Sequence, residues 1–213
     1  MKRRDLALAI AGCGLLSTTA WAQKGSFTQG TDYMELRQRV ATDAPAGQVE
    51  VIEFFWYSCS HCFQFEPQFA QWHKAPPKGV VVKRVPIAFR EDFAPQQRLY
   101  YTLEALGLVE KLHGAVFNTI HVQKKPLKTD AEILSWIGQQ AGVDAAKFQQ
   151  AYQSFGVAAK VRRATQLQNE YHIEGVPSFG IAGRFYTDGS MAGGMSRALQ
   201  VVESLAARAL SGR

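Results

Sequence analysis

The hydrophobic positions along the chain predict strands towards both ends and helices between them. Residues 49–57, VEVIEFFWY, are dense in β-branched and aromatic side chains, which predicts a buried strand. Residues 79–89, GVVVKRVPIAF, predict a second strand. Between them apolar positions recur at helical spacing, so we expect a helix that Pro67 bends. A strand, a helix and a strand in this order predict a right-handed βαβ unit with parallel strands.

The middle of the chain carries only helical patterns, from about residue 94 to residue 172. The T-x-x-E pattern at 129–132 predicts a capping box. Asp144 is expected to cap a helix over 145–156, and residues 157–173 are expected to form the longest helix. An all-helical block of roughly 75 residues follows, which is the size of a small domain.

Strand patterns return near the C-terminus. The segment VPSFGIAGRFYTDG predicts a β-hairpin, with strands at Ser178–Ala182 and Arg184–Thr187 and a turn at Ala182-Gly183. The segment MSRALQVVESLAARAL predicts a closing amphipathic helix. Residues 23–48 are polar and rich in turn formers, and we expect an extended lead-in with room for one short strand.

Composition and charge narrow the possible functions. The chain has 213 residues, of which 46% are hydrophobic and 20% charged, an ordinary globular composition. Its formal charge is +6, yet no basic stripe with interleaved aromatic residues occurs, so we expect no nucleic-acid binding. A solvated, mildly basic surface is the better interpretation.

The first residues predict export. Basic residues 2–4 precede an apolar run over 6–16, and Ala20 and Ala22 give the A-x-A arrangement that a signal peptidase accepts. We interpret residues 1–22 as a cleaved signal peptide and expect the mature protein in an oxidising, extracytoplasmic space. The apolar run is shorter than the roughly 20 residues that a membrane-spanning helix needs.

Two other interpretations of this leader stay open. The letters IAGC, which end at Cys13, resemble a lipobox, although a lipidated Cys13 would leave a very short signal. Arg3 and Arg4 resemble a twin-arginine signal, but the flanking pattern is poor. Removal of the leader takes away a net charge of +2 and leaves +4, and it leaves Cys59 and Cys62 as the only cysteines.

Cys59 and Cys62 form a C-x-x-C pair where the predicted strand meets the predicted helix. A structural zinc site needs four ligands, and the chain has neither a second pair nor an H-x(3–5)-H spacing. A c-type haem anchor needs C-x-x-C-H, but residue 63 is Phe. An inert disulfide would close too small a loop to restrain the unfolded chain much. We therefore predict a redox-active dithiol, with no metal and no other cofactor.

The predicted position of this pair favours a reactive sulfur. Unpaired N–H groups and the dipole at a helix N-terminus favour an anion, so we expect the pKa of Cys59 to fall below that of a free thiol. His61 would add positive charge if protonated, although it could be a plain surface histidine. Cys62, one turn into the helix, is expected to be buried and to act as the resolving thiol.

Glu53 stands in the middle of an otherwise apolar strand. It is either an edge residue that reaches water or, as we favour, a buried carboxyl that shuttles the proton of Cys62. Lys83 or Arg84 on the next strand could pair with Glu53, and the sequence does not distinguish them. Pro177, in GVPSF, is either a plain turn proline or a cis-proline that packs against the C-x-x-C, and we favour the second.

The chain resembles the DsbA-type periplasmic thiol–disulfide oxidoreductases of the thioredoxin superfamily. The residues that carry the resemblance are Glu53-Phe54-Phe55, Cys59-Ser60-His61-Cys62, Phe65-Glu66, Pro67 and Gly175-Val176-Pro177. One departure is Ser60, where the best-known members carry proline. Because the residues between the two cysteines tune redox poise, Ser60 leaves the oxidising strength of the pair open.

The resemblance implies an α/β, thioredoxin-like fold with an inserted all-helical domain. The thioredoxin-like parts would be residues 23–93 and 171–213, and the inserted domain residues 94–170. It also implies a catalyst that donates its Cys59–Cys62 disulfide to reduced exported proteins, through a mixed disulfide at Cys59.

The same resemblance implies partners. Val176 and Pro177 would hold an extended substrate by backbone contacts, and a DsbB-type membrane quinone reductase would reoxidise the enzyme, which we expect to be a monomer. Trp56, Tyr57 and Phe63 could add an apolar surface or belong to the core. The rival functions are a disulfide isomerase or reductase, and a thioredoxin-fold binding or chaperone module whose cysteines are incidental.

Overall fold

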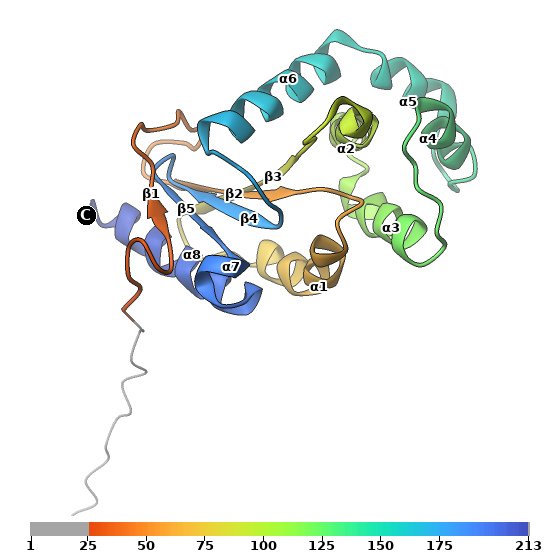
Figure 1. The fold of residues 1–213 in the computed structure, drawn as a ribbon. Helices are drawn as coiled ribbons and strands as arrows, with labels where there is room; N and C mark the ends of the chain where they lie inside the picture. Colours follow the sequence, from red (N-terminus) through yellow and green to blue (C-terminus); the bar gives the residue numbers. More distant parts are fainter. Residues whose placement is uncertain (1–25, 213) are drawn as a thin grey trace, which may run out of the picture.

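A sheet assembled from both ends of the chain forms the centre of the protein (Figure 1). The computed structural model describes residues 26–212, so the predicted leader at 1–22, with Cys13, lies outside the described residues. Within them the sheet has five strands in the order β1-β5-β4-β2-β3. The strands are β1 (Met34–Glu35), β2 (Val49–Phe55), β3 (Val80–Pro86), β4 (Ser178–Ile181) and β5 (Phe185–Asp188).

The predicted βαβ unit is confirmed. Strands β2 and β3 are parallel, and helix α1 (Ser60–Lys74) connects them. Strand β4 pairs antiparallel with the other side of β2, so β2 is a central strand and all seven of its residues are buried. An edge position for Glu53 is therefore wrong.

The predicted hairpin of β4 and β5 is confirmed as well. Three residues separate the paired Ile181 and Phe185, and the first two have positive φ, 58° at Ala182 and 63° at Gly183. The lead-in runs close to this turn. A Cβ on Gly183 would lie 2.0 Å from the carbonyl oxygen of Val40, so only glycine fits there.

Helices cover both faces of the sheet (Figure 1). On one face lie α1, α7 (Gly189–Ala192) and α8 (Met195–Leu210). Beyond β3 follow a short 3₁₀ turn (Glu91–Phe93) and α2 (Ala94–Ala105), α3 (Val109–His121), α4 (Asp130–Ile137), α5 (Ala145–Tyr152) and α6 (Phe155–Glu170). None of the helices in residues 26–212 is both long enough and apolar enough to cross a bilayer.

The helix caps explain where the helical prediction succeeds and where it fails. Thr129 and Glu132 form the predicted capping box, and the Asp144 carboxylate accepts a hydrogen bond from the N–H of Lys147. A continuous helix over 145–156 is wrong, because Ser154 interrupts it. The Ser154 hydroxyl accepts from the N–H of Val157 and starts a new helix, which makes α6 as long as α8, at 16 residues each.

Two hydrophobic clusters hold the layers together. One lies between the sheet and α1 and α8, and it includes Val51, Phe69 and Val202. The other joins the opposite face of the sheet to the helical block, and it includes Ile52 and Phe54. The alternation along β2 follows from the two-residue period of a strand.

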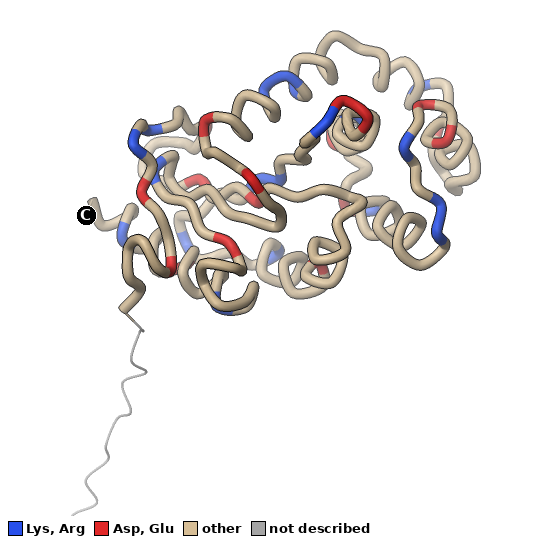
Figure 2. Tube along the Cα trace, viewed as in Figure 1, with Lys and Arg blue, Asp and Glu red and all other residues tan. Residues whose placement is uncertain are grey.

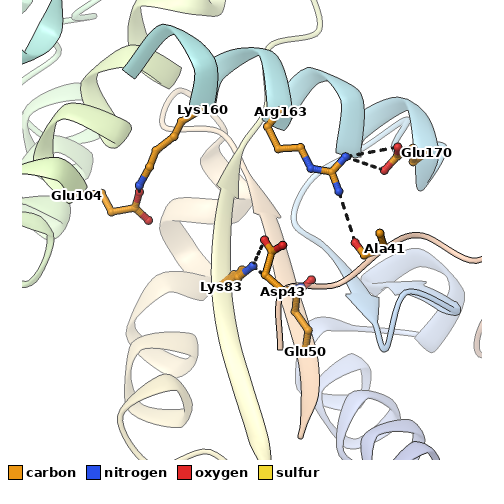
Figure 3. A network of polar contacts seen from close by, with 8 residues as sticks. All are labelled: Ala41, Asp43, Glu50, Lys83, Glu104, Lys160, Arg163 and Glu170. Atoms are coloured by element: carbon orange, nitrogen blue, oxygen red, sulfur yellow. Dashed lines mark hydrogen bonds and ion pairs between the residues drawn. The ribbon is translucent and has the colours of Figure 1, made fainter. Parts of the chain in front are cut away.

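Polar contacts tie the lead-in and α6 to the sheet (Figure 3). The ammonium of Lys83 lies 2.6 Å from the buried carboxylate of Glu50. It also lies 2.6 Å from the exposed carboxylate of Asp43. The Arg163 guanidinium binds Glu170 and donates to the carbonyl of Ala41. Lys83 is thus paired with Glu50 and Asp43, not with Glu53.

Charges are distributed without a dominant sign (Figure 2). Along the described elements, Lys and Arg residues are interspersed with Asp and Glu residues, as the sequence indicates. Several of them are paired across elements, for example Lys160 with Glu104 and Arg184 with Glu35. Such pairs at the surface contribute little stability each, about 0–1 kcal/mol.

Candidate active site

Cys59 is the N-cap residue of α1. Its backbone is extended, with φ −80° and ψ 119°, and its Sγ accepts a hydrogen bond from the N–H of Cys62 at 3.3 Å. An N-cap side chain satisfies an unpaired N–H of the first turn, and the positive end of the helix dipole favours negative charge there. Cys62 is 1% exposed, and both thiols are free in the structure.

The surroundings drive the pKa values of the two thiols apart. The hydrogen bond from the Cys62 thiol lowers the pKa of Cys59 to about 6, helped by the N–H groups of Cys62 and His61 and by the His61 ring, while partial burial opposes them. Burial, with the hydrogen bond and charge of Cys59, raises the pKa of Cys62 well above its ordinary value. At neutral pH, Cys59 is the thiolate and Cys62 the thiol.

The loop at 175–177 lies against the sulfur of Cys59. The peptide bond between Val176 and Pro177 is cis, and the Cys59 thiol donates to the carbonyl of Val176 at 3.3 Å. The structure therefore brings Val176 and Pro177 next to the C-x-x-C.

A cavity of about 480 Å³ adjoins this contact. Exposed His61, with Gln64 and Gln68, lines it from α1, and the 175–177 loop lines it from the other side. Asp188 and residues of the following segment, up to Met195, line it as well.

Glu53 lies in the middle of β2 and is 2% exposed. In the strand register it stands opposite Arg84, whose Nε lies 3.3 Å from its Oε2. Burial raises the pKa of Glu53 to about 8, Arg84 opposes the rise, and the charge of Glu66 adds to it. Glu53 therefore keeps its proton near neutral pH, and its charge, when present, raises the pKa of Cys62.

The aromatic residues before and after the pair divide between core and rim. Tyr57 is 1% exposed and belongs to the core. Trp56 and Phe63 are partly buried, and Trp56 packs on Phe93 with ring centroids 4.1 Å apart. Of the three aromatic residues named from the sequence, Trp56 and Phe63 are the two that are partly accessible.

Sequence reasoning missed two histidines of α3. The hydroxyl of Tyr57 is 2.8 Å from Nδ1 of His113, and the His121 ring donates to the Tyr57 carbonyl at 2.7 Å. The His121 ring also stacks on Phe63, at a centroid distance of 4.7 Å. The two histidines are eight residues apart, about two helical turns, so their shared helix face was the available signal.

A second missed contact lies on the other side of the turn. The buried amide of Gln96 in α2 donates to the hydroxyl of Ser58 at 2.7 Å and to the carbonyl of Pro126 at 2.9 Å. Helices α2 and α3 of the helical block thus both hold residues that directly precede Cys59. In residues 26–212 no group of three or more His, Cys, Asp or Glu side chains is arranged to hold a metal ion.

Comparison with known proteins gives consistent matches. The family model described as "DSBA-like thioredoxin domain" matches residues 75–206. The chain is 38% identical to the thiol:disulfide interchange protein DsbA of Burkholderia cepacia over 95% of both chains. It is 40% identical to that of Bordetella pertussis, over 92% of this chain and 93% of the relative. The crystal structure of Pseudomonas aeruginosa DsbA matches with a TM-score of 0.81 at 33% identity, covering 88% of this chain and 97% of that one.

Proposed function

Because the chain belongs to the family of DsbA-like thioredoxin-fold proteins and is a protein disulfide oxidoreductase, we propose that it donates the Cys59–Cys62 disulfide to reduced exported proteins. The contrast between the two sulfurs is the observation that carries this proposal. Cys59 is partly exposed and has a lowered pKa, whereas Cys62 is buried and has a raised one. An exposed, stabilised thiolate beside a buried thiol suits exchange at Cys59 alone.

The first step opens the enzyme disulfide. A substrate thiolate attacks Sγ of Cys59, the bond between Cys59 and Cys62 breaks, and its electron pair goes to Sγ of Cys62. The buried Cys62 thiolate then takes the proton of Glu53, which Glu53 carries at neutral pH because its pKa is about 8. Water replaces that proton on Glu53 afterwards.

The second step releases the product. The second substrate thiol loses its proton to water and attacks the substrate sulfur of the mixed disulfide, and Cys59 leaves as a thiolate. The substrate has lost two electrons and gained a disulfide, and the enzyme holds both electrons as its dithiol. A low pKa makes Cys59 a good leaving group, and a stabilised thiolate favours the reduced enzyme, so the disulfide is oxidising.

The 175–177 loop positions the substrate in this scheme. The backbone of Val176 and Pro177 pairs with an extended segment of the substrate, which continues into the cavity beside α1. His61 lines the same cavity and favours the thiolate of Cys59. Both the contact at 3.3 Å and the shared cavity support these roles.

The remaining assignments complete the proposal. Residues 1–22 direct the chain to the periplasm, where it works as a monomer and a membrane quinone reductase of the DsbB type reoxidises it. Residues 23–93 and 171–213 form the thioredoxin-like part, and residues 94–170 the inserted helical domain. Mass spectrometry of the protein from periplasmic extracts tests the leader, because cleavage after Ala22 gives a chain that starts at Gln23.

The deciding experiment measures oxidation of a reduced test protein that needs a disulfide to fold. The purified mature protein is expected to oxidise it, and Cys59→Ser, checked for an unchanged circular dichroism spectrum, is expected to lose this activity. Full activity of Cys59→Ser would contradict the proposal. The reduction potential then gives the direction of exchange, since a value near about −270 mV, as in thioredoxin, would indicate a reductase.

A further inference from the structure

Arg84 lies between the buried carboxylate of Glu53 and the partly buried carboxylate of Glu66, and it contacts them unequally. Its Nη2 donates to Oε1 of Glu66 at 2.9 Å. Its Nε lies 3.3 Å from Oε2 of Glu53, but without hydrogen-bond geometry, and both of these atoms lack a hydrogen-bond partner among residues 26–212. The better contact of the guanidinium is therefore with Glu66, not with Glu53.

His113 completes the surroundings of Glu66. It is 4% exposed, and its Nε2 lies 3.4 Å from Oε2 of Glu66, while its Nδ1 is 2.8 Å from the hydroxyl of Tyr57. Burial and the charge of Arg84 lower the pKa of His113, and Glu66 opposes them, so the ring is neutral near pH 7. With the Tyr57 hydroxyl donating to Nδ1, the ring hydrogen is on Nε2 and faces Glu66. Oε1 of Glu66 thus accepts a hydrogen bond from Arg84, and its Oε2 lies next to the His113 Nε2, at an ion-pair distance without hydrogen-bond geometry.

We propose that Glu66 and His113 are positioning residues of the exchange reaction, which hold the Arg84 guanidinium on Glu66 and so leave the proton of Glu53 available to Cys62. This inference rests on the proposed function, in which Glu53 is the proton partner of Cys62. It assigns the two residues no contact with the substrate.

Electrostatics favours this distribution of charge. One guanidinium cannot neutralise two carboxylates that are largely buried, so one of them keeps a proton. Burial by itself raises the pKa of Glu66, but the contact with His113 and the charge of Arg84 outweigh it, and the pKa of Glu66 is lowered. The ionised Glu66 in turn adds to the raised pKa of Glu53.

The groups of this network and those around it come from β2, β3, α1, α2 and α3 and from the turn before Cys59. Glu53 faces Arg84 of β3 and Glu66 and Cys62 of α1. His113 and its neighbours border a cavity of about 50 Å³, which is large enough for a water molecule. The titratable and charged groups around His113 are Glu66, His73 and Lys74 on α1, Arg84 on β3, Glu110 on α3, Tyr57 before Cys59, and Tyr100 on α2.

The first test measures the protonation of Glu53 directly. The side-chain carboxyl carbons of the reduced mature protein are labelled with ¹³C and titrated by NMR in wild type, Glu66→Gln and Glu110→Gln. In Glu66→Gln the whole guanidinium becomes available to Glu53, so its midpoint is expected to fall by about one pH unit or more. Glu110→Gln is the matched control, because it removes the same charge from an exposed residue nearby that makes no ion pair with Arg84. The Glu53 midpoint is expected to be unchanged in this variant.

The histidine is tested by two substitutions. His113→Leu is expected to lower the Glu53 midpoint in the same direction but by less, because Arg84 still binds Glu66. His113→Gln keeps an N–H donor for Glu66 and is expected to restore the wild-type midpoint. An unchanged Glu53 midpoint in Glu66→Gln, or an equal fall in Glu110→Gln, would overturn the inference.

The second test follows the rate of substrate oxidation, per substrate thiolate, against pH. The rate of wild type is expected to decline as Glu53 loses its proton, and Glu66→Gln is expected to shift this decline to lower pH. In the Glu53→Gln background, Glu66→Gln is expected to leave the pH profile of the rate unchanged. If Glu66→Gln acted only through the structure, it would shift the profile in this background too, and such a shift would overturn the inference. A Glu53→Gln profile identical to wild type would instead contradict the proposed role of Glu53, even with the NMR midpoints as expected.

Discussion

The sulfur of Cys59 lies 3.3 Å from the carbonyl oxygen of Val176, 117 positions later in the chain. The carbonyl accepts from the thiol and so favours the protonated sulfur, whereas the N–H of Cys62 favours the thiolate. The state of Cys59 therefore depends on groups that lie far apart in the chain.

The first prediction concerns the pKa of Cys59. Ultraviolet absorbance of the thiolate in the reduced protein is expected to titrate with a midpoint of about 6. Cys62→Ala is expected to raise this midpoint, because the Cys62 thiol makes the largest contribution to the lowered pKa. An unchanged midpoint in Cys62→Ala would show that the N–H groups of the helix alone stabilise the thiolate.

The same pKa predicts how stability depends on pH. Between about pH 6 and the ordinary thiol range near ~8.5, unfolded Cys59 keeps its proton while native Cys59 has lost it. The unfolded state binds more protons, so this group stabilises the reduced protein increasingly as pH rises and loses its contribution below about pH 6. Denaturant unfolding of reduced wild type and Cys59→Ser across this range measures the difference, and a gap that narrows with rising pH would contradict the prediction.

The contribution of Glu53 to stability changes with pH in the opposite direction. Between its usual pKa and about 8, native Glu53 keeps a proton that the unfolded chain has lost, so its contribution to stability falls as pH rises. Glu53→Gln is expected to be more stable than wild type, with an advantage that grows by up to about 1.4 kcal/mol per pH unit. Denaturant unfolding at several pH values tests this, and a pH-independent difference would argue against a proton on buried Glu53.

Tyr57 links the active-site turn to α3. Tyr57→Phe removes the hydroxyl that binds Nδ1 of His113 and leaves a buried acceptor unpaired, so we expect a loss of about 1–2 kcal/mol in the free energy of unfolding. Tyr101→Phe is the matched control, because Tyr101 is also buried and its hydroxyl has no hydrogen bond among the described residues. Equal losses in the two variants would indicate an effect of ring packing alone.

Replacement of Lys83 tests the network of polar contacts in Figure 3. Lys83→Met leaves the carboxylate of Glu50, which is 3% exposed, without its cation, and we expect a loss of about 2–4 kcal/mol with little change in exchange rate. Lys160→Met breaks the pair with Glu104 at the surface and is expected to cost under about 1 kcal/mol. Thermal and denaturant unfolding compare the two, and similar losses would mean that burial of Glu50 carries no energetic weight.

Local patterns predicted the parts of the site that depend on local structure. The strand, the C-x-x-C and the helix after it are contiguous, so the sequence placed Cys59 at the N-cap and Cys62 within the first turn. Burial of Glu53 followed from the apolar residues on both sides of it. The break before Ser154 was missed because a serine is weakly distinctive in a helical pattern, and its capping role appears only with the bond to Val157.

Contacts across the fold could not be predicted in this way. Lys83 and Arg84 are adjacent in one strand and point to opposite faces, so the partner of Glu53 depends on the register between β2 and β3. That register sets Glu53 opposite Arg84. The bonds of Tyr57 to His113 and His121 depend on how α3 packs against the sheet, which no spacing within the sequence specifies.

The hydrophobic cluster shared by the sheet and the helical block has a calorimetric consequence. Phe55 at the end of β2 packs against Tyr100 of α2 and against His113 and Phe117 of α3. Neither part can melt without exposing the aromatic rings of the other, so heating should give one endotherm with equal calorimetric and van't Hoff enthalpies. The sheet and the helices between β3 and β4 would then unfold as one cooperative unit, and Cys59 packs against the hydrophobic cluster that joins them.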